Sequence, residues 1–258
     1  MQILIQIKAI FVGFFALVFV LLPGCLIAFP FPLERRLKMV SPVWKYFGLI
    51  ILRYACHAKI RISEDHRSEA FNVIPAKGLL IANHQSYMDI PLQATKHQAP
   101  PIMKKEVLNI PILGWMAWIS GALPVSRSKT ASRRQVFEKA KKRITKQGIG
   151  LQVYPEGTRS KTAHPKAYSE IKRTLLIFAY NEKIPVIPVS IYGTRGILNA
   201  KGMINPGRSV GIIVHKEIDP KDFSAVDVFT EACWNQVIQG YDQMQAQLGP
   251  LNENLSLP

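Results

Sequence analysis

The residues from Gly78 to Ala82 form a short, continuously apolar run, and this run limits the folds that the chain can adopt. A strand with one solvated face alternates apolar and polar side chains, whereas a strand buried on both faces is apolar throughout. The run therefore predicts a strand in a sheet that is covered on both faces. In α/β proteins that cover comes from helices.

The rest of the chain alternates short apolar runs with helical patterns, which is typical of an α/β domain. Strands are predicted at Lys59–Ile62, Gly78–Ala82, Ile102–Met103, Ala122–Val125, Ile149–Tyr154, Val186–Tyr192 and Val210–Val214. Helices are predicted after Asp89, around Ile112–Ile119, and over Thr130–Gln147, Glu170–Asn181 and Ser224–Leu248. We expect a single α/β domain over residues 59–249, with a central mixed, largely parallel sheet flanked by helices. The residues 250–258 are expected to be a disordered tail.

The N-terminal residues 1–58 are expected to be membrane-anchoring helices. Ala9 to Phe31 carries no charged residue and is long enough to cross a bilayer core. Pro23-Gly24 should kink or end this helix, so a spanning helix and a half-inserted hairpin are both open. Val43–Ala55 is too short to span and suits an interfacial helix. The basic residues Arg35, Arg36 and Lys38 place the following chain on the cytoplasmic side of the cytoplasmic membrane.

Cysteine usage bears on the compartment. Cys25, Cys56 and Cys233 are few, odd in number and far apart, which indicates neither a disulfide framework nor a metal site. A reducing compartment is the simplest interpretation. The sequence Leu22-Pro23-Gly24-Cys25 also resembles a lipoprotein signal peptide, but the apolar run continues past Cys25 through Phe31, which disfavours cleavage there.

The net charge of +16, from 33 Lys and Arg against 17 Asp and Glu, requires an anionic partner. The chain has no zinc-finger spacing, no RNP-type aromatic strand and no heptad zipper, so nucleic acid is the weakest candidate. An anionic bilayer surface and a phosphorylated substrate remain. Thr130–Gln147 is strongly basic with only Glu138 opposing, and beside an apolar anchor this favours contact with anionic lipid over a merely solvated face.

Directly after the Gly78–Ala82 run comes Asn83-His84-Gln85-Ser86-Tyr87-Met88-Asp89. His84 and Asp89 can meet only if His84 lies in a loop and Asp89 in the first turn of a helix, either as its N-cap or in a capping box with Ser86. An imidazole that donates one N–H to a carboxylate keeps the other nitrogen free to accept a proton. The pair is therefore a candidate general base. The plain alternative is that Asp89 only caps a helix and His84 is an ordinary loop residue.

A second polar stretch, Val153-Tyr154-Pro155-Glu156-Gly157-Thr158-Arg159-Ser160, follows another predicted strand. Asn-His-x-x-x-x-Asp followed about seventy residues later by Pro-Glu-Gly-Thr-Arg-Ser resembles the 1-acylglycerol-3-phosphate acyltransferases, a family of glycerolipid acyltransferases. The resemblance covers about Leu79 to Tyr192. It implies a membrane-bound enzyme that moves an acyl group from acyl-CoA or acyl-acyl-carrier protein to the sn-2 hydroxyl of 1-acylglycerol 3-phosphate, giving phosphatidic acid.

The resemblance also implies roles for named residues. His84 and Asp89 would be catalytic, and the turn of Glu156, Gly157, Thr158 and Arg159 would bind substrate. The phosphate would be held by Arg159, Lys105 and further by Lys104 or Arg127, because guanidinium and ammonium groups bind phosphate. Alternatively, Arg159 pairs with Glu156 to hold its own turn, and the lysines face lipid head groups. No cofactor other than the acyl thioester and no metal ligand cluster is expected.

One departure from the family pattern leaves the acceptor open. Where the family usually has Phe-x-x-Gly, this chain has Ile171-Lys172-Arg173-Thr174. Another lyso-lipid, such as a lyso-ornithine lipid or lysophosphatidylglycerol, is therefore an alternative acceptor. From other classes, the same His-Asp pair could activate water in a thioesterase or lipase, or the chain could be a non-catalytic basic membrane adaptor.

Overall fold

The computed structural model describes residues 2–65, 77–96, 99–126, 130–160, 162, 164–198 and 202–249. The predicted tail at 250–258 and the candidate phosphate ligand Arg127 lie outside these residues.

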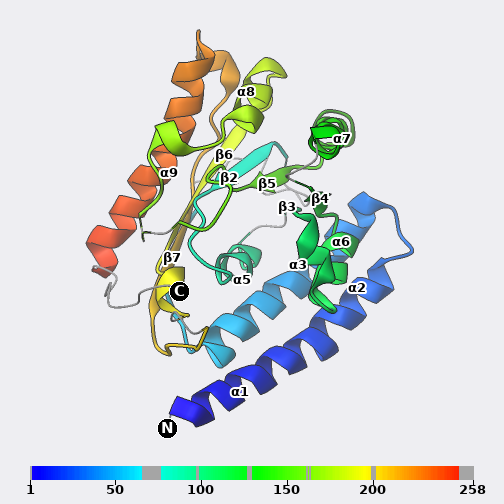
Figure 1. Cartoon of the computed structure of the whole chain (residues 1–258), viewed down its shortest axis with the longest axis vertical. Helices are drawn as coiled ribbons and strands as arrows, with labels where there is room; N and C mark the ends of the chain where they lie inside the picture. The colour runs from blue at the N-terminus through cyan, green and yellow to red at the C-terminus, as the bar shows by residue number, and fades with distance from the viewer. Residues whose placement is uncertain are drawn as a thin grey trace.

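A five-stranded sheet forms the centre of the molecule, in the order β1-β7-β6-β2-β5 (Figure 1). Its strands are β1 (Lys59–Asp65), β2 (Leu79–Ala82), β5 (Leu151–Val153), β6 (Val186–Tyr192) and β7 (Ser209–Val214). The β6–β7 pairing is antiparallel and the other pairings are parallel. A separate parallel pair consists of β3 (Ile102–Lys104) and β4 (Leu123–Val125). The predicted mixed, largely parallel sheet is confirmed.

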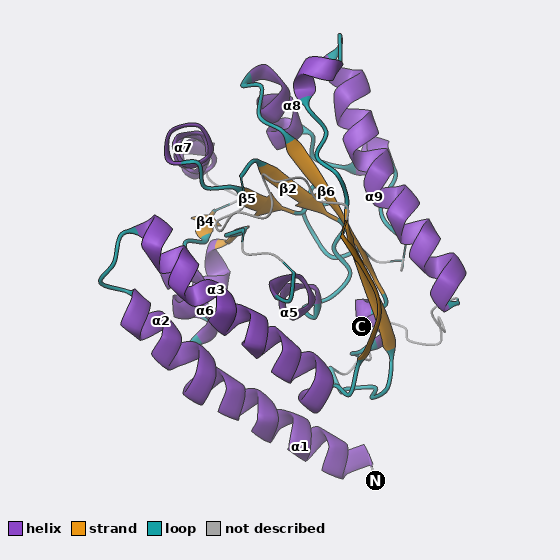
Figure 2. Cartoon of the chain, turned by 180° about the vertical axis from the view of Figure 1, so that it is seen from behind, coloured by secondary structure: helices purple, strands orange, loops and turns teal. Residues whose placement is uncertain are grey.

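Helices cover both faces of the sheet (Figure 2). The helices after β2 are α5 (Asp89–Ala94), α6 (Leu113–Ile119), α7 (Thr130–Lys141), α8 (Thr174–Asn181) and α9 (Val226–Leu248). The side chains of β2 alternate between two cores. Leu80 and Ala82 pack in one core with Leu92 of α5, whereas Leu79 and Ile81 pack in the other with residues of α7, α8 and α9. All four β2 residues are buried, as the apolar run predicted.

The N-terminal chain is a helical hairpin. Helix α1 (Gln2–Phe15) continues through a π-helical segment (Ala16–Leu21) into α2 (Leu22–Ala28), and α3 (Leu33–Ile50) runs back beside it (Figure 1). The stretch Gln2–Ala28 is long and apolar enough to cross a membrane, with a mean hydropathy of 2.8 in its most apolar window.

Pro23-Gly24 does not end this helix, contrary to one of the two expected effects. Pro23 lies in the first turn of α2, where the missing N–H is tolerated, and the π-helical turns come just before it. A Cβ atom on Gly24 would lie 2.7 Å from both methyl carbons of Val43. Glycine at this position therefore lets α2 and α3 pack closely.

Several helices begin or end at residues other than those predicted. Helix α3 begins at Leu33, ten residues before the predicted interfacial stretch, because Leu37 and Val40 already face the core. Helix α8 begins at Thr174, after a short 3₁₀ turn at Tyr168–Glu170. Helix α7 continues as a π-helical segment (Lys142–Lys146) and the chain then turns at Gly148, which has a φ of +63°.

Candidate active site

The candidate site lies at the carboxyl ends of three neighbouring parallel strands. β2, β5 and β6 lie side by side, so their carboxyl ends reach the same edge of the sheet. The loop with His84 follows β2, the turn of Tyr154 to Ser160 follows β5, and Gly193-Thr194 follows β6. In open α/β sheets, ligands bind at this edge. The topology thus brings together segments that are more than a hundred residues apart in the sequence.

His84 and Asp89 form the predicted pair. The His84 Nδ1 atom lies 2.7 Å from Asp89 Oδ2. Asp89 is fully buried, while the His84 side chain keeps 18% of its surface exposed. The contact to a carboxylate oxygen requires a proton on Nδ1, which leaves Nε2 as the proton acceptor when the ring is neutral. The geometry is that of an oriented general base.

The Asp89 carboxylate is held from several sides. Oδ2 also accepts hydrogen bonds from the backbone N–H groups of Gln85, at 2.7 Å, and Ser86, at 3.0 Å. The Ser86 hydroxyl accepts one from Met88 N at 3.2 Å. The chain adopts neither predicted helix start, because the N-cap of α5 is Met88 and Asp89 is the first residue inside the helix. Only one half of the predicted capping box forms, the hydrogen bond from Ser86 N to the Asp89 carboxylate.

Thr194 is a site residue that the sequence analysis missed. Its hydroxyl donates to Asp89 Oδ1 and lies 3.2 Å from Gln85 Oε1. Thr194 is fully buried and directly follows Gly193, whose φ of +85° turns the chain at the end of β6. The only available signal was its place just after a predicted strand neighbouring the one that leads to His84.

Glu156 fixes the backbone of His84 rather than its ring. Glu156 Oε1 accepts a hydrogen bond from His84 N at 3.0 Å, and Ser160 N donates to His84 O at 2.7 Å. The other Glu156 oxygen, Oε2, is buried without a hydrogen-bond partner. Burial raises the pKa of Glu156 from its ordinary value of 4.5 to about 7, with the His84 N–H acting in the opposite direction. The turn after β5 is thereby attached to the loop after β2.

Two further side chains position this loop. The ring of Tyr154 stacks on His84 with the centroids 4.1 Å apart, and its hydroxyl accepts a hydrogen bond from Gln93 at 3.0 Å. Burial raises the pKa of Tyr154 well above its usual value, so the phenol stays neutral. Asn83 bonds to both the N–H and the carbonyl of Ile191 in β6, each at 2.8 Å. Neither role was predicted.

The side chains that were predicted to bind phosphate are more exposed to solvent than the His84–Asp89 pair. Arg159 is exposed and its Cζ atom lies 4.2 Å from the ring centroid of Tyr87, three residues after His84. It makes no ion pair with Glu156, so that alternative is wrong. Lys104 and Lys105 are exposed where β3 ends, and Thr158 is exposed in the turn beside Arg159.

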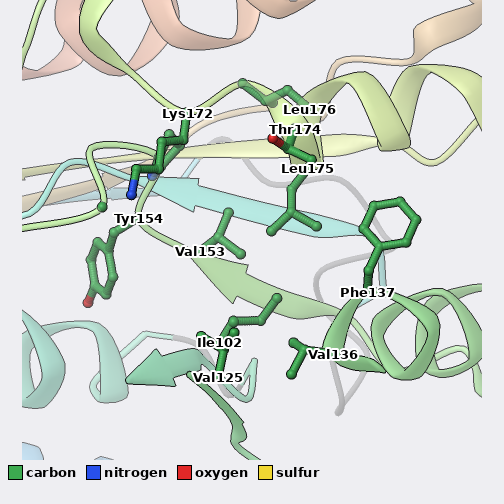
Figure 3. A pocket seen from close by; sticks show the side chains of 12 residues that line it. Ile102, Val125, Val136, Phe137, Val153, Tyr154, Lys172, Thr174, Leu175 and Leu176 are labelled. Carbon is green, nitrogen blue, oxygen red and sulfur yellow. The ribbon is translucent and has the colours of Figure 1, made fainter. Parts of the chain in front are cut away.

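An apolar pocket opens beside this turn (Figure 3), with a volume of about 240 Å³. It lies between β5, the β3–β4 pair, α7 and the start of α8. Ile102, Val125, Val136, Phe137, Val153, Leu175 and Leu176 form its apolar walls. Tyr154 and Gly157 line it as well, so the pocket adjoins the ring that stacks on His84.

Lys172 and Gly157 lie together at the same pocket. Gly157 has a φ of +70°, and a Cβ atom there would lie 3.0 Å from both Cε and Nζ of Lys172. The Lys172 ammonium group therefore extends over the Glu156–Arg159 turn and adds a positive charge there. The sequence did not predict a role for Lys172. Within the described residues, no group of three or more His, Cys, Asp or Glu could hold a metal ion.

Comparison with known proteins gives the family. The sequence model of the family described as Acyltransferase matches residues 59–192, more than half of the chain. The chain belongs to the acyltransferase family. The match ends at the last residue of β6, so the acyltransferase region contains both strand ends that carry His84 and Glu156.

Curated relatives and a solved structure agree with this assignment. The chain is 28% identical to a 1-acyl-sn-glycerol-3-phosphate acyltransferase of Salmonella typhimurium over 74% of this chain and 73% of that protein. It is 34% identical to an uncharacterized acyltransferase of Schizosaccharomyces pombe over 44% of this chain. That match spans only 41% of the yeast protein, and the match to a chloroplastic 1-acyl-sn-glycerol-3-phosphate acyltransferase of Brassica napus spans 40%.

The fold of this acyltransferase is similar to that of the crystallised 1-acyl-sn-glycerophosphate acyltransferase PlsC of Thermotoga maritima. The TM-score is 0.75 at 25% identity, over 96% of this chain and 98% of that chain. The similarity thus extends through the N-terminal helical hairpin as well as the α/β domain.

Proposed function

We propose that this acyltransferase is a membrane-bound 1-acylglycerol-3-phosphate O-acyltransferase, which transfers an acyl group from a thioester to the free sn-2 hydroxyl and gives phosphatidic acid. The observation that carries the proposal is the His84–Asp89 pair at 2.7 Å, with a stacked Tyr154 that also lines an apolar pocket. The relatives named for this activity support the choice of acceptor.

In the proposed reaction His84 acts as the general base. Its Nδ1–H is bonded to Asp89, so Nε2 accepts the proton of the acceptor hydroxyl while the oxygen attacks the thioester carbon. The carbon–sulfur bond then breaks, and the thiolate leaves with the proton from the imidazolium. Asp89 stabilises the imidazolium that forms in between. The reaction requires no metal and no cofactor besides the thioester.

The oxyanion needs hydrogen-bond donors close to His84. Several backbone N–H groups near the ring are already used. Gln85 and Ser86 donate to Asp89, Met88 to Ser86, and Gly157 to Tyr154 O. Among the described residues, the backbone N–H groups of Thr158 and Arg159 have no protein acceptor, and we assign the oxyanion to them.

The substrates are placed by the two sides of the site. We assign an acyl chain to the apolar pocket, because its walls are aliphatic and aromatic and it adjoins Tyr154. We assign the acceptor phosphate to Arg159, Lys104 and Lys105, with Lys172 close by. A phosphomonoester carries about two negative charges, and several basic groups can share it.

The N-terminal hairpin would hold the enzyme at the membrane, where both lipids are found. Apolar side chains are exposed along much of α1, the π-helical segment and α2, Ile3, Ile10, Phe11, Phe19 and Ile27 among them. Arg35, Arg36 and Lys38 follow directly, which favours the cytoplasmic membrane with the active site facing the cytoplasm. The donor, acyl-CoA or acyl-acyl-carrier protein, would reach the site from that side.

A second acceptor class is favoured by one observation. Thr174, which replaces the glycine usual in the family, lines the pocket beside Lys172. A lyso-lipid with a different head group, such as a lyso-ornithine lipid or lysophosphatidylglycerol, is the alternative acceptor.

The test is an acyl-transfer assay with the full chain in mixed micelles, using 1-acylglycerol 3-phosphate, lysophosphatidylglycerol and a lyso-ornithine lipid as separate acceptors. We expect phosphatidic acid to be the main product and His84→Ala to lose activity by about 10² to 10⁴-fold. Acylation of a phosphate-free acceptor alone would refute the assigned acceptor. Thiol release that is independent of every acceptor would indicate a thioesterase instead, and full activity of His84→Ala would remove the catalytic assignment.

A further inference from the structure

Two arginines from distant parts of the chain converge at the end of α6, away from the residues assigned to acyl transfer. Arg36 lies in α3 and its Nη1 donates to Ile119 O at 3.1 Å. Arg143 lies in the π-helical segment after α7, and its Nη1 donates to Gly121 O. Both guanidinium groups are partly buried. Each arginine therefore donates one N–H group to a backbone carbonyl oxygen. Its guanidinium group keeps further N–H donors that can bind a ligand.

Among the described residues, these two positive charges have no acidic partner. Neither arginine takes part in an ion pair among the residues that the structure describes. Arg36 Nε is buried without any hydrogen-bond partner. Burial and, to a smaller extent, the charge of Arg36 together lower the pKa of Arg143 from 12.5 to about 10. Two like charges in a partly desolvated place are unfavourable unless an anion balances them.

Capping of α6 does not balance this charge. The carboxyl end of a helix carries a negative charge of only about half an elementary charge. Helix α6 is also short, with only the residues Leu113–Ile119. Two guanidinium groups exceed that charge several-fold. A phosphate group, in contrast, carries one or more full negative charges and presents oxygens that match the guanidinium fork.

The surroundings favour a phosphate that belongs to a lipid. Phe29 and Trp118 are 46% and 51% exposed, and their ring centroids lie 6.2 Å apart. Arg36 Cζ lies 5.6 Å from the Phe29 centroid. Phe29 directly follows the apolar stretch Gln2–Ala28, so the arginines lie where that stretch meets polar chain. Exposed aromatic rings beside basic groups are typical of the head-group level of a bilayer.

We infer that Arg36 and Arg143 form a binding site for the phosphate of an anionic membrane phospholipid, with Phe29 and Trp118 against its glycerol and upper acyl region. The site ties α3 and the segment after α7 to one lipid molecule and so fixes the height of the α/β domain above the bilayer. It shares the membrane setting of the proposed function but does not depend on acyl transfer.

The test measures lipid binding without turnover. The full chain in dodecyl maltoside micelles is titrated with phosphatidylglycerol or with phosphatidylcholine of the same acyl chains, and bound lipid is counted by native mass spectrometry. We expect wild type to prefer phosphatidylglycerol. The double variant Arg36→Gln/Arg143→Gln should bind phosphatidylglycerol about tenfold more weakly and lose the preference.

Matched variants separate this site from other basic groups. Arg35→Gln/Lys45→Gln makes the same charge change at exposed positions of α3 and should keep the preference. Arg159→Ala, which alters the assigned acceptor site, should also keep it, whether or not the enzyme proposal holds. A preference lost equally in Arg35→Gln/Lys45→Gln would show general electrostatic attraction and overturn the site.

A conservative variant distinguishes a loss of lipid binding from a loss of folding. Arg143→Lys keeps the charge but loses the fork, and it should lose part of the preference while melting at the wild-type temperature in lipid-free micelles. An unchanged preference in Arg143→Lys and in the double variant overturns the inference. If inorganic phosphate alone displaces phosphatidylglycerol and gives the same protection against melting, the site binds a free anion and the lipid assignment is wrong.

Discussion

Asp89 is fully buried and its carboxylate is held by His84, Gln85, Ser86 and Thr194, whereas Arg159, in the neighbouring turn, is exposed and contacts the ring of Tyr87. The two regions follow two neighbouring parallel strands, β2 and β5. They differ in how many protein partners fix each functional group.

Under the proposed function, this difference corresponds to two tasks. A general base contributes only if its ring stays in the right tautomer and orientation, so its supports belong inside the protein. A phosphate-binding group must keep its donors free for the ligand, so it stays on the surface. Changes on the buried side should therefore lower kcat, and changes on the exposed side should raise KM.

The largest effect is expected from Asp89→Asn. The amide keeps the volume but carries no negative charge, so the imidazolium of His84 loses its counter-charge, and the hydrogen bond from His84 Nδ1–H to the side chain becomes weaker. We expect kcat to fall by about 10³-fold with little change in the KM of the acceptor. Steady-state kinetics with both substrates varied would measure this. A fall confined to KM would break the comparison, because Asp89 would then act in binding.

Arg159→Ala, on the exposed side of the site, should have the next largest effect. Loss of a guanidinium that binds phosphate should weaken binding of the phosphorylated acceptor, so the acceptor KM should rise about 10 to 100-fold with a smaller change in kcat. Steady-state kinetics with the lysophosphatidic acid concentration varied would measure the rise. Arg159→Lys, which keeps the charge, should recover part of the loss. A neutral lyso-lipid acceptor serves as the control, since its KM should not respond to either variant.

Thr194→Val sharpens the comparison at a residue outside the recognised motifs. Valine has the shape of threonine but cannot donate to Asp89 Oδ1, so the carboxylate can rotate and His84 with it. We expect kcat to fall about tenfold at constant KM. Thr194→Ser retains the hydroxyl and should restore most of the rate. Equal losses in the two variants would point to packing rather than to the hydrogen bond.

The same contrast explains what the sequence could predict. Every strand of the two sheets was expected close to its observed place, because buried strands leave continuous apolar runs such as Leu79–Ala82. His84 and Asp89 were found because they are five residues apart and a local helix start brings them together. Local geometry was enough for both.

Contacts between distant segments were not predictable in this way. Thr194 reaches Asp89 across 105 positions, and Asn83 reaches Ile191 across 108. Neither contact leaves a periodic or short-range pattern. Only the order of strands, with β6 beside β2, brings them together, and that order is a property of the whole sheet. The start of α3 was missed for a related reason: the helix begins at Leu33, ahead of the buried Leu37, rather than where its hydropathy rises.

The smallest effect is expected from Glu156→Gln, and it concerns stability. The pKa of Glu156 is raised from 4.5 to about 7, so the folded state holds the proton more tightly than the unfolded state does. The proton-linked stability is therefore fully present below about pH 4.5 and is lost as the pH rises through 7, where a buried charge forms. The loss is on the order of 3 kcal/mol.

Glutamine keeps an oxygen for the His84 N–H but cannot ionise. We therefore expect the wild-type melting temperature to fall between pH 5 and pH 8 relative to that of Glu156→Gln, with the two proteins closest at pH 5. Thermal unfolding in micelles at several pH values measures the difference. A constant difference across this range would mean that Glu156 ionises normally, and the buried side of the site would then be more open to water than its Oε2 atom indicates.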